Sequence, residues 1–358
     1  MVHYDGGNMN NLNRINILIF GSLSQGKGGT QSIEGNLKFD TLFFTFHGVE
    51  FCDKRWRSTV KKVISPTKWL PRILQEYIVV KVLRTYVYRQ SIKVIVCTDE
   101  KACKLAAKAR GGKNKPALLS WLHRSLHTFK HKDYFNLVDA HIAIAKEIAT
   151  QINEISNKPI FVINNCVSLS REYQFKRSDK SPPSFIYVGR IEFEGQKRLR
   201  DLITAFSLVR DNNVHLQIIG DGTDISQCIK LCEDLHLTQR VHFYGWQRNP
   251  WEFCFNNFKN VVALCLTSSY EGFPMVLIEA ISQGIFCISS NCSTGPKEII
   301  NEHNGLLYSE GNITELSLCM EKALKGAKRP YGELYVNDKW SKKEYIKSWE
   351  KVIFQLRL

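Results

Sequence analysis

The 358-residue sequence has no run of 18 apolar residues long enough to span a bilayer. Residues 1–13 are polar and lack the charged start and apolar centre of a secretory signal, so we expect a flexible extension there. The eleven cysteines follow no spacing that is typical of a disulfide framework or a zinc site. These absences argue against a membrane-spanning protein and a disulfide-stapled secreted domain, and they favour a cytoplasmic protein without a bound metal.

Acidic residues are scarce in the first half of the chain. Residues 1–183 contain 29 Lys and Arg against 14 Asp and Glu, whereas residues 184–358 contain 20 of each, so the first half holds the whole net charge of +15. Such a field attracts nucleic acid, phosphorylated glycans or a membrane surface. The charge is densest among apolar and aromatic residues at 54–93, interrupted by Pro66 and Pro71. This segment is either a helix with a solvated basic face or an element that docks on a membrane interface.

Length and a hydrophobic content of 44% predict two globular domains. Short apolar segments alternate with helical ones on both sides of the polar stretch 168–184. We therefore expect an α/β protein with two doubly wound domains, 1–167 and 185–335, joined by the linker 168–184, and a helix within 336–358 that crosses back to the first domain. Ligands bind beyond the carboxyl ends of such strands, here in the cleft between the domains. The expected strands are 15–20, 41–46, 94–97, 117–120, 140–144, 161–164, 185–188, 216–219, 241–244, 261–266 and 286–289.

The strongest motif follows the expected strand 261–266 and opens an apolar helix. Proline is suited to the first turn of a helix, so the free N–H groups beside Pro274 can bind an anion such as a diphosphate. Glu271 lies just before the helix and Glu279 lies inside it, and carboxylates accept hydrogen bonds from sugar or ribose hydroxyls. The motif predicts a nucleotide-sugar site at this helix start, formed by Glu271, Gly272, Phe273, Pro274, Met275 and Glu279.

A second cluster follows the expected strand 185–188. Arg190 and Lys197 flank a short loop there, and two fixed cations can neutralise a leaving diphosphate. Taken alone, such a pair is more often a solvated surface pair, but the neighbouring motif favours the diphosphate. Asp221 and Asp224 lack the spacing of a metal-binding Asp-x-Asp motif and are expected to form a turn, so no metal is expected.

These segments occur in order with Ile218-Ile-Gly-Asp-Gly222 and Phe243-Tyr-Gly245. Together they resemble the donor domain of retaining glycosyltransferases of the GT-B fold, glycosyltransferase family 4. The resemblance is strong over about 184–310 and looser in the first half, where Ser120–Leu126 and Ala140–Ile144 match. It implies two Rossmann-like domains, an acceptor-binding domain at 1–167 and a donor-binding domain at 185–335.

The resemblance also implies roles for single residues. The diphosphate would be held by Arg190 and Lys197, the ribose by Glu279 and the donor sugar by Glu271. The loop from Tyr244 would recognise uracil, chiefly through the backbone of Trp246. His123 would lie by the donor sugar and the acceptor, although a lone histidine is otherwise more often structural. Gly28 and Gly29 would lie near the phosphates. The catalytic candidates are thus His123, Glu271, Arg190 and Lys197.

The implied activity is retaining, metal-independent transfer of a hexose, with galactose favoured, from a UDP-sugar to a sugar hydroxyl of a lipopolysaccharide core. The UDP-sugar is a substrate, and no further cofactor is expected. The basic first half fits an anionic glycolipid acceptor and peripheral contact with the inner face of the inner membrane. The alternatives are another UDP-hexose transferase (UDP-glucose or UDP-N-acetylhexosamine) acting on capsule or O-antigen glycan, a UDP-sugar epimerase and, more remotely, a nucleic-acid-binding protein, for which no recognised module is present.

Overall fold

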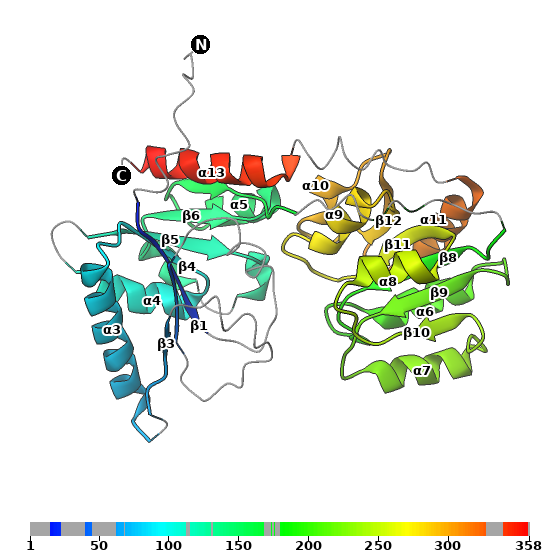
Figure 1. Ribbon diagram of the computed structural model, residues 1–358, viewed down its shortest axis with the longest axis horizontal. Coiled ribbons are helices and arrows are strands. Elements are labelled where there is room, and N and C mark those ends of the chain that lie inside the picture. Colours follow the sequence, from blue (N-terminus) through cyan, green and yellow to red (C-terminus); the bar gives the residue numbers. More distant parts are fainter. Residues whose placement is uncertain are drawn as a thin grey trace, which may run out of the picture. The chain divides into compact units, whose positions relative to one another are not determined.

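The computed structural model describes residues 15–22, 40–44, 62–67, 69–111, 115–129, 132–167, 173, 175, 180–326 and 339–356 (Figure 1). The chain divides into two compact units. The first comprises Met1–Cys166 with Lys342–Leu358, and the second comprises Val167–Ser341. Each unit contains one parallel sheet and its own helices, which confirms the predicted doubly wound α/β class.

The first unit contains a seven-stranded parallel sheet in the order β3-β2-β1-β4-β5-β6-β7. Its central strands are buried, which explains why they are continuous apolar runs in the sequence. The order reverses between β1 and β4, which pair directly. The strands are β1 (Ile17–Ser22), β2 (Asp40–Phe44), β3 (Lys62–Ile64), β4 (Val94–Cys97), β5 (Ala117–Leu122), β6 (Ala140–Ala143) and β7 (Ile160–Val162).

Helices from both ends of the sequence belong to the first unit. The side chain of Asp99 caps the start of α4 by accepting from the N–H of Ala102. The last helix, α13, brings Trp349 to β5, where its ring lies 5.4 Å from that of Trp121 between centroids. The helices are α3 (Arg72–Arg89), which packs on α4 (Glu100–Ala109), α5 (Lys146–Asn153) and α13 (Lys342–Gln355), with the short turns η2 (Leu126–Thr128) and η3 (Asp133–Asn136).

Two edge strands were absent from the sequence prediction. The basic segment 54–93 was interpreted either as a helix with a solvated basic face or as an element that docks on a membrane interface. In its described part α3 is the one helix, and Lys62–Ile64 forms β3 beside β2. Val63 and Ile64 are β-branched and favour a strand, although basic neighbours obscure this preference. The other unexpected strand, β13 (Gly305–Tyr308), has only four residues and pairs with β12.

The second unit contains a six-stranded parallel sheet in the order β10-β9-β8-β11-β12-β13. Alternate residues of its strands, such as Phe185 and Tyr187, join one core cluster with α6, α7 and α11, whereas α9 contacts β11 and β12. The elements are β8 (Ser184–Val188), α6 (Leu199–Ser207), β9 (His215–Ile219), α7 (Ile225–Asp234), β10 (Val241–Phe243), α8 (Pro250–Asn257), β11 (Val261–Leu266), α9 (Met275–Ser282), β12 (Phe286–Ser290), α10 (Pro296–Ile299), β13 and α11 (Ile313–Gly326).

The strand order of the second sheet reverses between β8 and β11, which are hydrogen-bonded neighbours. Loops that leave two such strands run to opposite faces of a sheet, so a ligand can bind beyond the carboxyl ends of the strands. The loop after β8 contains Arg190 and Lys197, and the loop after β11 contains Glu271. The fold therefore gathers the two motifs of the sequence at one point.

Candidate active site

Glycines hold the loop after β8 against the loop after β9. The N–H of Gly189 donates to the carbonyl of Ile219 at 3.0 Å. A Cβ at Gly220 would lie 1.7 Å from the carbonyl oxygen of Gly189, and one at Gly222 would lie 1.9 Å from that of Ile191. Only residues without a side chain permit this approach, so the Ile218-Ile-Gly-Asp-Gly222 motif fixes the backbone from which Arg190 projects.

Arg190 combines a fixed backbone with an accessible guanidinium group. The hydroxyl of Tyr187 donates to the Arg190 carbonyl at 2.6 Å. The Nε of Arg190 lies 3.0 Å from Oε1 of Glu192, and its Nη2 donates to Oε1 of Gln196 at 3.0 Å. The Arg190 side chain is 58% exposed, so an incoming anion can reach it.

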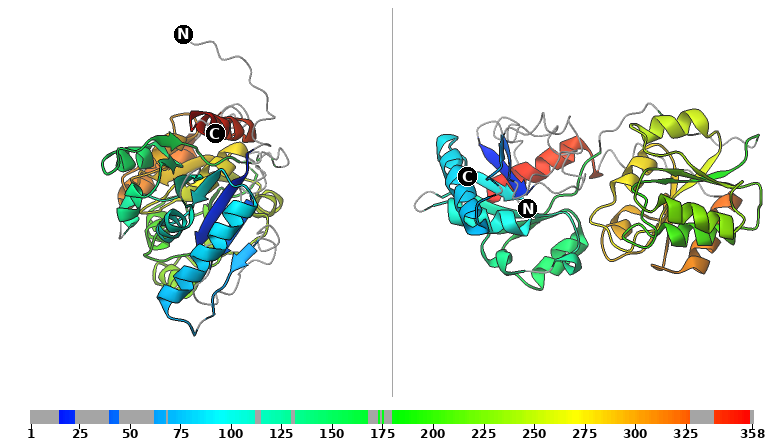
Figure 2. Two further views of the ribbon diagram at one scale, coloured as in Figure 1. Left: turned by 90° about the vertical axis from the view of Figure 1, so that its left-hand side faces the viewer. Right: turned by 90° about the horizontal axis from the view of Figure 1, so that it is seen from below.

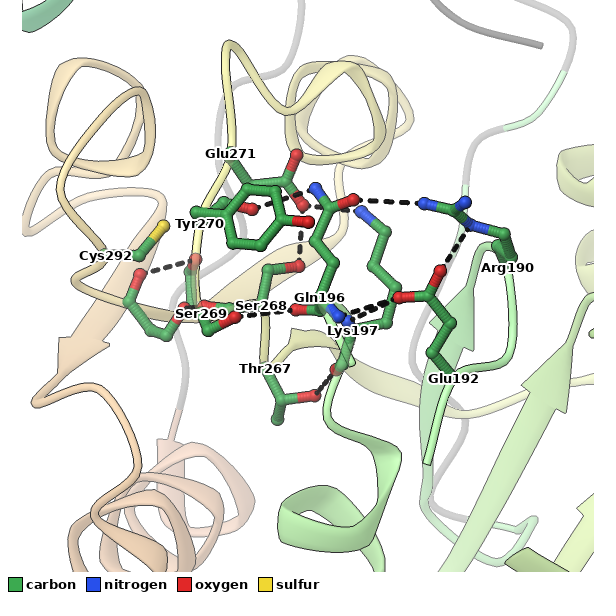
Figure 3. Close-up of polar contacts among 12 residues, drawn as sticks. Arg190, Glu192, Gln196, Lys197, Thr267, Ser268, Ser269, Tyr270, Glu271 and Cys292 are labelled. Carbon is green, nitrogen blue, oxygen red and sulfur yellow. Dashed lines mark hydrogen bonds and ion pairs between the residues drawn. The ribbon is translucent and has the colours of Figure 1, made fainter. Parts of the chain in front are cut away.

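Lys197 and Glu271 form a largely buried ion pair that joins the two loops (Figure 3). The Nζ of Lys197 lies 2.5 Å from Oε1 of Glu271, and the two side chains are 16% and 10% exposed. Ser268 is fully buried and its hydroxyl donates to the same carboxylate oxygen at 2.6 Å. The hydroxyl of Thr267 donates to the carbonyl of Lys197 at 2.7 Å. One carboxylate oxygen is therefore held by a cation and a hydroxyl, which fixes its position.

Gln196 forms a second link between the loops. Its side-chain Nε2 donates to the backbone carbonyl of Tyr270 at 2.9 Å, and its backbone carbonyl accepts from the N–H of Ser269 at 2.9 Å. Its N–H donates to Glu192 at 2.8 Å. Sequence reasoning did not single out Gln196 or Ser268. For Ser268 the sequence offered one signal, namely the run of hydroxyl residues directly after β11. Side chains at the carboxyl end of such a strand lie near the region where ligands bind.

The helix start has the arrangement that the sequence predicts. Helix α9 begins at Met275, with Pro274 in the capping position before it. The first N–H groups of any helix lack intrahelical acceptors and form its positive end. A Cβ at Gly295, whose φ is +92°, would lie 2.6 Å from Cδ of Pro274 and 3.0 Å from the carbonyl oxygen of Gly272. Because Gly295 has no side chain, the loop before α10 can pack closely against the loop before α9.

Two further contacts hold this loop in place. The ring of Phe273 is buried and lies 6.0 Å from that of Trp340 between centroids. The hydroxyl of Thr294 donates to the carbonyl of Glu271. Side chains and backbone of this loop are thus fixed from two directions, so its polar groups are positioned before any ligand arrives.

Glu279 lies inside α9 near an indole from α8. The Nε1 of Trp251 donates to Oε2 of Glu279 at 3.2 Å. Burial raises the pKa of Glu279, and the hydrogen bond from Trp251 opposes this shift. The carboxylate keeps acceptor capacity for a further donor, because each of its oxygens has two lone pairs.

The loop after β10 is tied to the same glycine region. The hydroxyl of Tyr244 donates to Oε1 of Gln217 at 2.8 Å. Gly245 has a φ of +66°, and its carbonyl accepts from the N–H of Gly220 at 2.9 Å. Trp246 follows and is 63% exposed. A base could therefore meet this loop next to the segment that carries Arg190.

His123 belongs to the first unit and follows β5 directly. Its ring lies 4.5 Å from that of Trp121 between centroids, and its Nε2 is buried without a hydrogen-bond partner among the residues that the structure describes. Burial lowers the pKa of His123 to about 4. Gly28 and Gly29 lie outside the described residues. The other candidates, including Arg190, belong to the second unit.

No group of three or more metal-binding side chains is found within the described part of the chain. The carboxylate of Asp221 accepts from the N–H of Gly222 at 2.8 Å, and that of Asp224 accepts from the N–H of Phe193 at 3.0 Å. Both carboxylates thus take part in local turns. Of the helices in the ranges described, none is long and apolar enough to cross a membrane.

Two doubly wound units, one with two cations and a carboxylate beside the start of helix α9, are consistent with one class of protein. Residues 170–333 match the family model described as Glycosyl transferases group 1. The chain is 35% identical over 323 residues to the lipopolysaccharide 1,6-galactosyltransferase of Salmonella typhimurium, a match covering 87% of this chain and 90% of the relative. The Escherichia coli protein of the same name is 34% identical, with 87% and 89% covered. The chain belongs to the group 1 glycosyltransferases, glycosyltransferase family 4, as predicted.

Solved structures agree with this assignment. The apo form of the lipopolysaccharide outer core galactosyltransferase WaaB superposes with a TM-score of 0.83 at 32% identity, covering 95% of this chain and 99% of that one. The HepE protein of Anabaena in complex with UDP superposes with a TM-score of 0.76 at 16% identity, covering 95% and 100%. The predicted GT-B fold is thereby confirmed.

Proposed function

We propose that this glycosyltransferase moves a hexose, galactose in the first place, from a UDP-sugar to a sugar hydroxyl of a lipopolysaccharide core. The observation that carries the proposal is the Lys197–Glu271–Ser268 cluster beside the start of α9. Two relatives whose names state galactose transfer to lipopolysaccharide align with almost nine-tenths of the chain, which supports the choice of donor and acceptor.

The second unit would bind the donor. Arg190, Lys197 and the first N–H groups of α9 would hold the diphosphate, since all three supply positive charge. Glu279 would accept hydrogen bonds from the ribose, and the Tyr244 loop, through the backbone of Trp246, would recognise uracil. In this proposal residues 185–335 form the donor-binding domain.

Glu271 would orient the transferred sugar. Its Oε1 is occupied by Lys197 and Ser268, whereas its Oε2 accepts no bond from the residues that the structure describes. That oxygen is therefore the one that would accept from a sugar hydroxyl. Lys197 would then have two roles, because it fixes this carboxylate and adds charge beside the diphosphate.

The chemical step would retain the anomeric configuration. The bond from the anomeric carbon to the diphosphate breaks, and the acceptor oxygen bonds to the same face of the sugar. The proton of the acceptor hydroxyl passes to the leaving phosphate oxygen. Arg190, Lys197 and the helix start would stabilise the charge that develops there, so the reaction would need no metal ion.

The first unit, residues 1–167 in this proposal, would bind the acceptor. His123, with Gly28 and Gly29, would lie on the acceptor side, while the linker 168–184 and the closing segment 336–358 connect the two domains. The basic charge of this half fits a phosphorylated, anionic glycolipid. The enzyme would act in the cytoplasm, peripherally at the inner face of the inner membrane.

A single assay tests the proposal. The protein is incubated with UDP-galactose, UDP-glucose or UDP-N-acetylglucosamine and with truncated lipopolysaccharides, with and without EDTA, and the products are identified by mass spectrometry and NMR. We expect hexose transfer with retention, greatest with UDP-galactose and unaffected by EDTA. The incubation is repeated with capsule and O-antigen glycans and without an acceptor, and binding of oligonucleotides and of UDP is measured alongside. Transfer only to capsule or O-antigen glycan, conversion of the UDP-sugar without an acceptor, or salt-dependent oligonucleotide binding without UDP binding would each contradict it.

A further inference from the structure

Helix α3 of the first unit has apolar residues on a second face as well as on its buried face. Its inner face is buried against the rest of the unit through Gln75, Val79, Leu83 and Val87. Large side chains also point away from the unit: Ile73 is 82% exposed, Tyr77 64% and Tyr88 86%. Trp69, just before the helix, is 96% exposed. A helix with a single apolar face buries that face against one partner. The second apolar face of α3 therefore requires an explanation.

The exposed apolar residues lie along one side of the helix, which we call the outer stripe. At 3.6 residues per turn, Ile73, Tyr77 and Tyr88 fall within about 60° of one another around the helix axis, and their mean direction lies about 130° from that of the buried residues. Figure 2 shows α3 along its length on the outside of the first unit. The stripe therefore faces away from the sheet from its first turn to its last.

The stripe is also basic. Lys81 is exposed about 20° from Tyr88 around the helix axis, and Arg89 is exposed at the end of the helix, about 100° from Tyr88 and so at the edge of the stripe. Glu76 is the one acidic residue of α3, and its two carboxylate oxygens lie 3.6 Å from Lys101 and 3.9 Å from Lys108 of α4. The acid is thus turned toward α4, and no negative charge of the helix opposes the cations of the outer stripe.

We propose that this outer face of α3, namely Trp69, Ile73, Tyr77, Lys81, Tyr88 and Arg89, docks on an anionic lipid bilayer. The proposal rests on the proposed function, because an acceptor glycolipid lies in such a bilayer. Trp and Tyr place an apolar ring and a polar edge at the boundary between acyl chains and headgroups, and Lys and Arg bind anionic headgroups. Docking through these residues brings the first unit to the membrane surface.

Charge favours a bilayer over a second copy of the chain. The first half of the sequence has 29 basic and 14 acidic residues. Two copies of the outer face of α3 would bring like charges together, which opposes association, whereas an anionic surface attracts each of them.

Vesicle sedimentation tests the proposal. We expect the wild type to bind phosphatidylglycerol–phosphatidylethanolamine vesicles and not phosphatidylcholine vesicles. The triple variant Trp69→Ser, Ile73→Ser, Tyr77→Ser should have a vesicle partition coefficient lower by about tenfold or more, since it loses three apolar contacts. Lys81→Gln with Arg89→Gln should lower partitioning by about tenfold or more at low salt. Leu318→Ser is the matched control, because Leu318 is a comparable exposed residue (64%) on α11 of the second unit.

The fluorescence of Trp69 provides an independent readout. The emission difference between the wild type and Trp69→Phe isolates the signal of this residue from those of the other tryptophans. We expect it to shift to shorter wavelength on anionic vesicles and to be quenched by lipids brominated in the acyl chain. Equal vesicle binding by wild type and triple variant, an unshifted Trp69 signal on bound vesicles, or a dimer that the triple variant converts to monomer without vesicle binding would overturn the proposal.

Failure of the docking proposal can be distinguished from failure of the proposed function. If docking is right, the triple variant transfers sugar to a delipidated core oligosaccharide at the wild-type rate and to vesicle-embedded lipopolysaccharide more slowly. If docking is wrong, the two proteins use both acceptors equally well. If the proposed function alone is wrong, the vesicle binding and its loss in the variant remain, without transfer to either acceptor.

Discussion

The two units of this glycosyltransferase use their charges differently. In the second, basic and acidic residues are nearly balanced, and the candidate cations are held by carboxylates: Arg190 by Glu192 and Lys197 by Glu271. In the first, basic residues outnumber acidic ones about two to one, and exposed cations line the outer face of α3. Cations that are held in place by carboxylates can bind one small anion in one orientation. An excess of positive charge without acidic partners instead attracts an extended anionic partner. A defined motif and a diffuse charge excess thus indicate two kinds of recognition.

The largest expected effect comes from breaking the matched charges of the second unit. Lys197→Ala removes a cation beside the proposed diphosphate and leaves the buried Glu271 carboxylate without its charged partner. We expect kcat/KM to fall by roughly 100- to 1000-fold, the range found when one stabilising donor is removed from an active site. Steady-state kinetics with the preferred UDP-sugar would measure it.

Lys347→Ala is the control for this variant, because Lys347 makes a similar 2.5 Å pair with Glu344 that is exposed on α13. It should leave kcat/KM unchanged within about twofold, as expected for a surface pair. Undiminished turnover by Lys197→Ala would remove the ion pair from the proposed mechanism.

The sequence predicted the second unit in more detail than the first. Arg190, Glu271 and Glu279 were found as candidates because each lies at a fixed offset from a recognisable strand or helix start. The contact between Lys197 and Glu271 could not be predicted, since the residues are 74 positions apart and meet only through the pairing of β8 with β11. In the first unit, charge density predicted that an anionic partner binds. It did not predict which side of α3 is exposed, because both sides carry apolar residues.

The next largest effect is expected from the hydroxyl that positions Glu271. Ser268→Ala removes a 2.6 Å hydrogen bond to a buried carboxylate, a contact worth roughly a tenfold change or more for a charged acceptor. We expect kcat to fall about tenfold while KM changes little, because the serine acts through Glu271. Ser348→Ala, which removes a hydroxyl bonded to a helix carbonyl in α13, should have no effect. Equal kinetics for the two variants would contradict a positioning role.

Glu279→Gln should separate binding from stability. Because burial raises the pKa of Glu279, the ionised form is disfavoured in the folded chain, and stability is lost as pH rises through this pKa. The neutral glutamine should therefore raise the melting temperature slightly at neutral pH, while UDP affinity falls about fivefold as the ribose loses a charged acceptor. Calorimetry at pH 7 and at lower pH measures both quantities. A lower melting temperature together with unchanged UDP affinity would argue for a purely structural residue.

The smallest expected effect concerns two histidines of the first unit, the buried His141 and the partly buried His123. Burial lowers the pKa of both His123 and His141 to about 4. His141 is hydrogen-bonded to Ser120 at 2.6 Å and to Ser156 at 2.9 Å, whereas Nε2 of His123 has no partner in the described part of the chain. Both rings are thus neutral at physiological pH, and an activity profile should show no step near 6.5 from His123.

The same shifts predict how stability depends on pH. Between about pH 6.5 and 4 the unfolded chain binds protons that the folded histidines do not, so stability falls as pH falls. Each of the two histidines contributes up to about 1.4 kcal/mol per pH unit in this range. Unfolding in urea at pH 7 and pH 5 should therefore give a smaller pH dependence for His123→Gln than for the wild type. His141→Gln should reduce it equally, but it should also lower stability at pH 7, because two buried serine contacts are disturbed. An unchanged pH dependence in His123→Gln would mean that His123 is hydrated, and its neutral state could then no longer be attributed to burial.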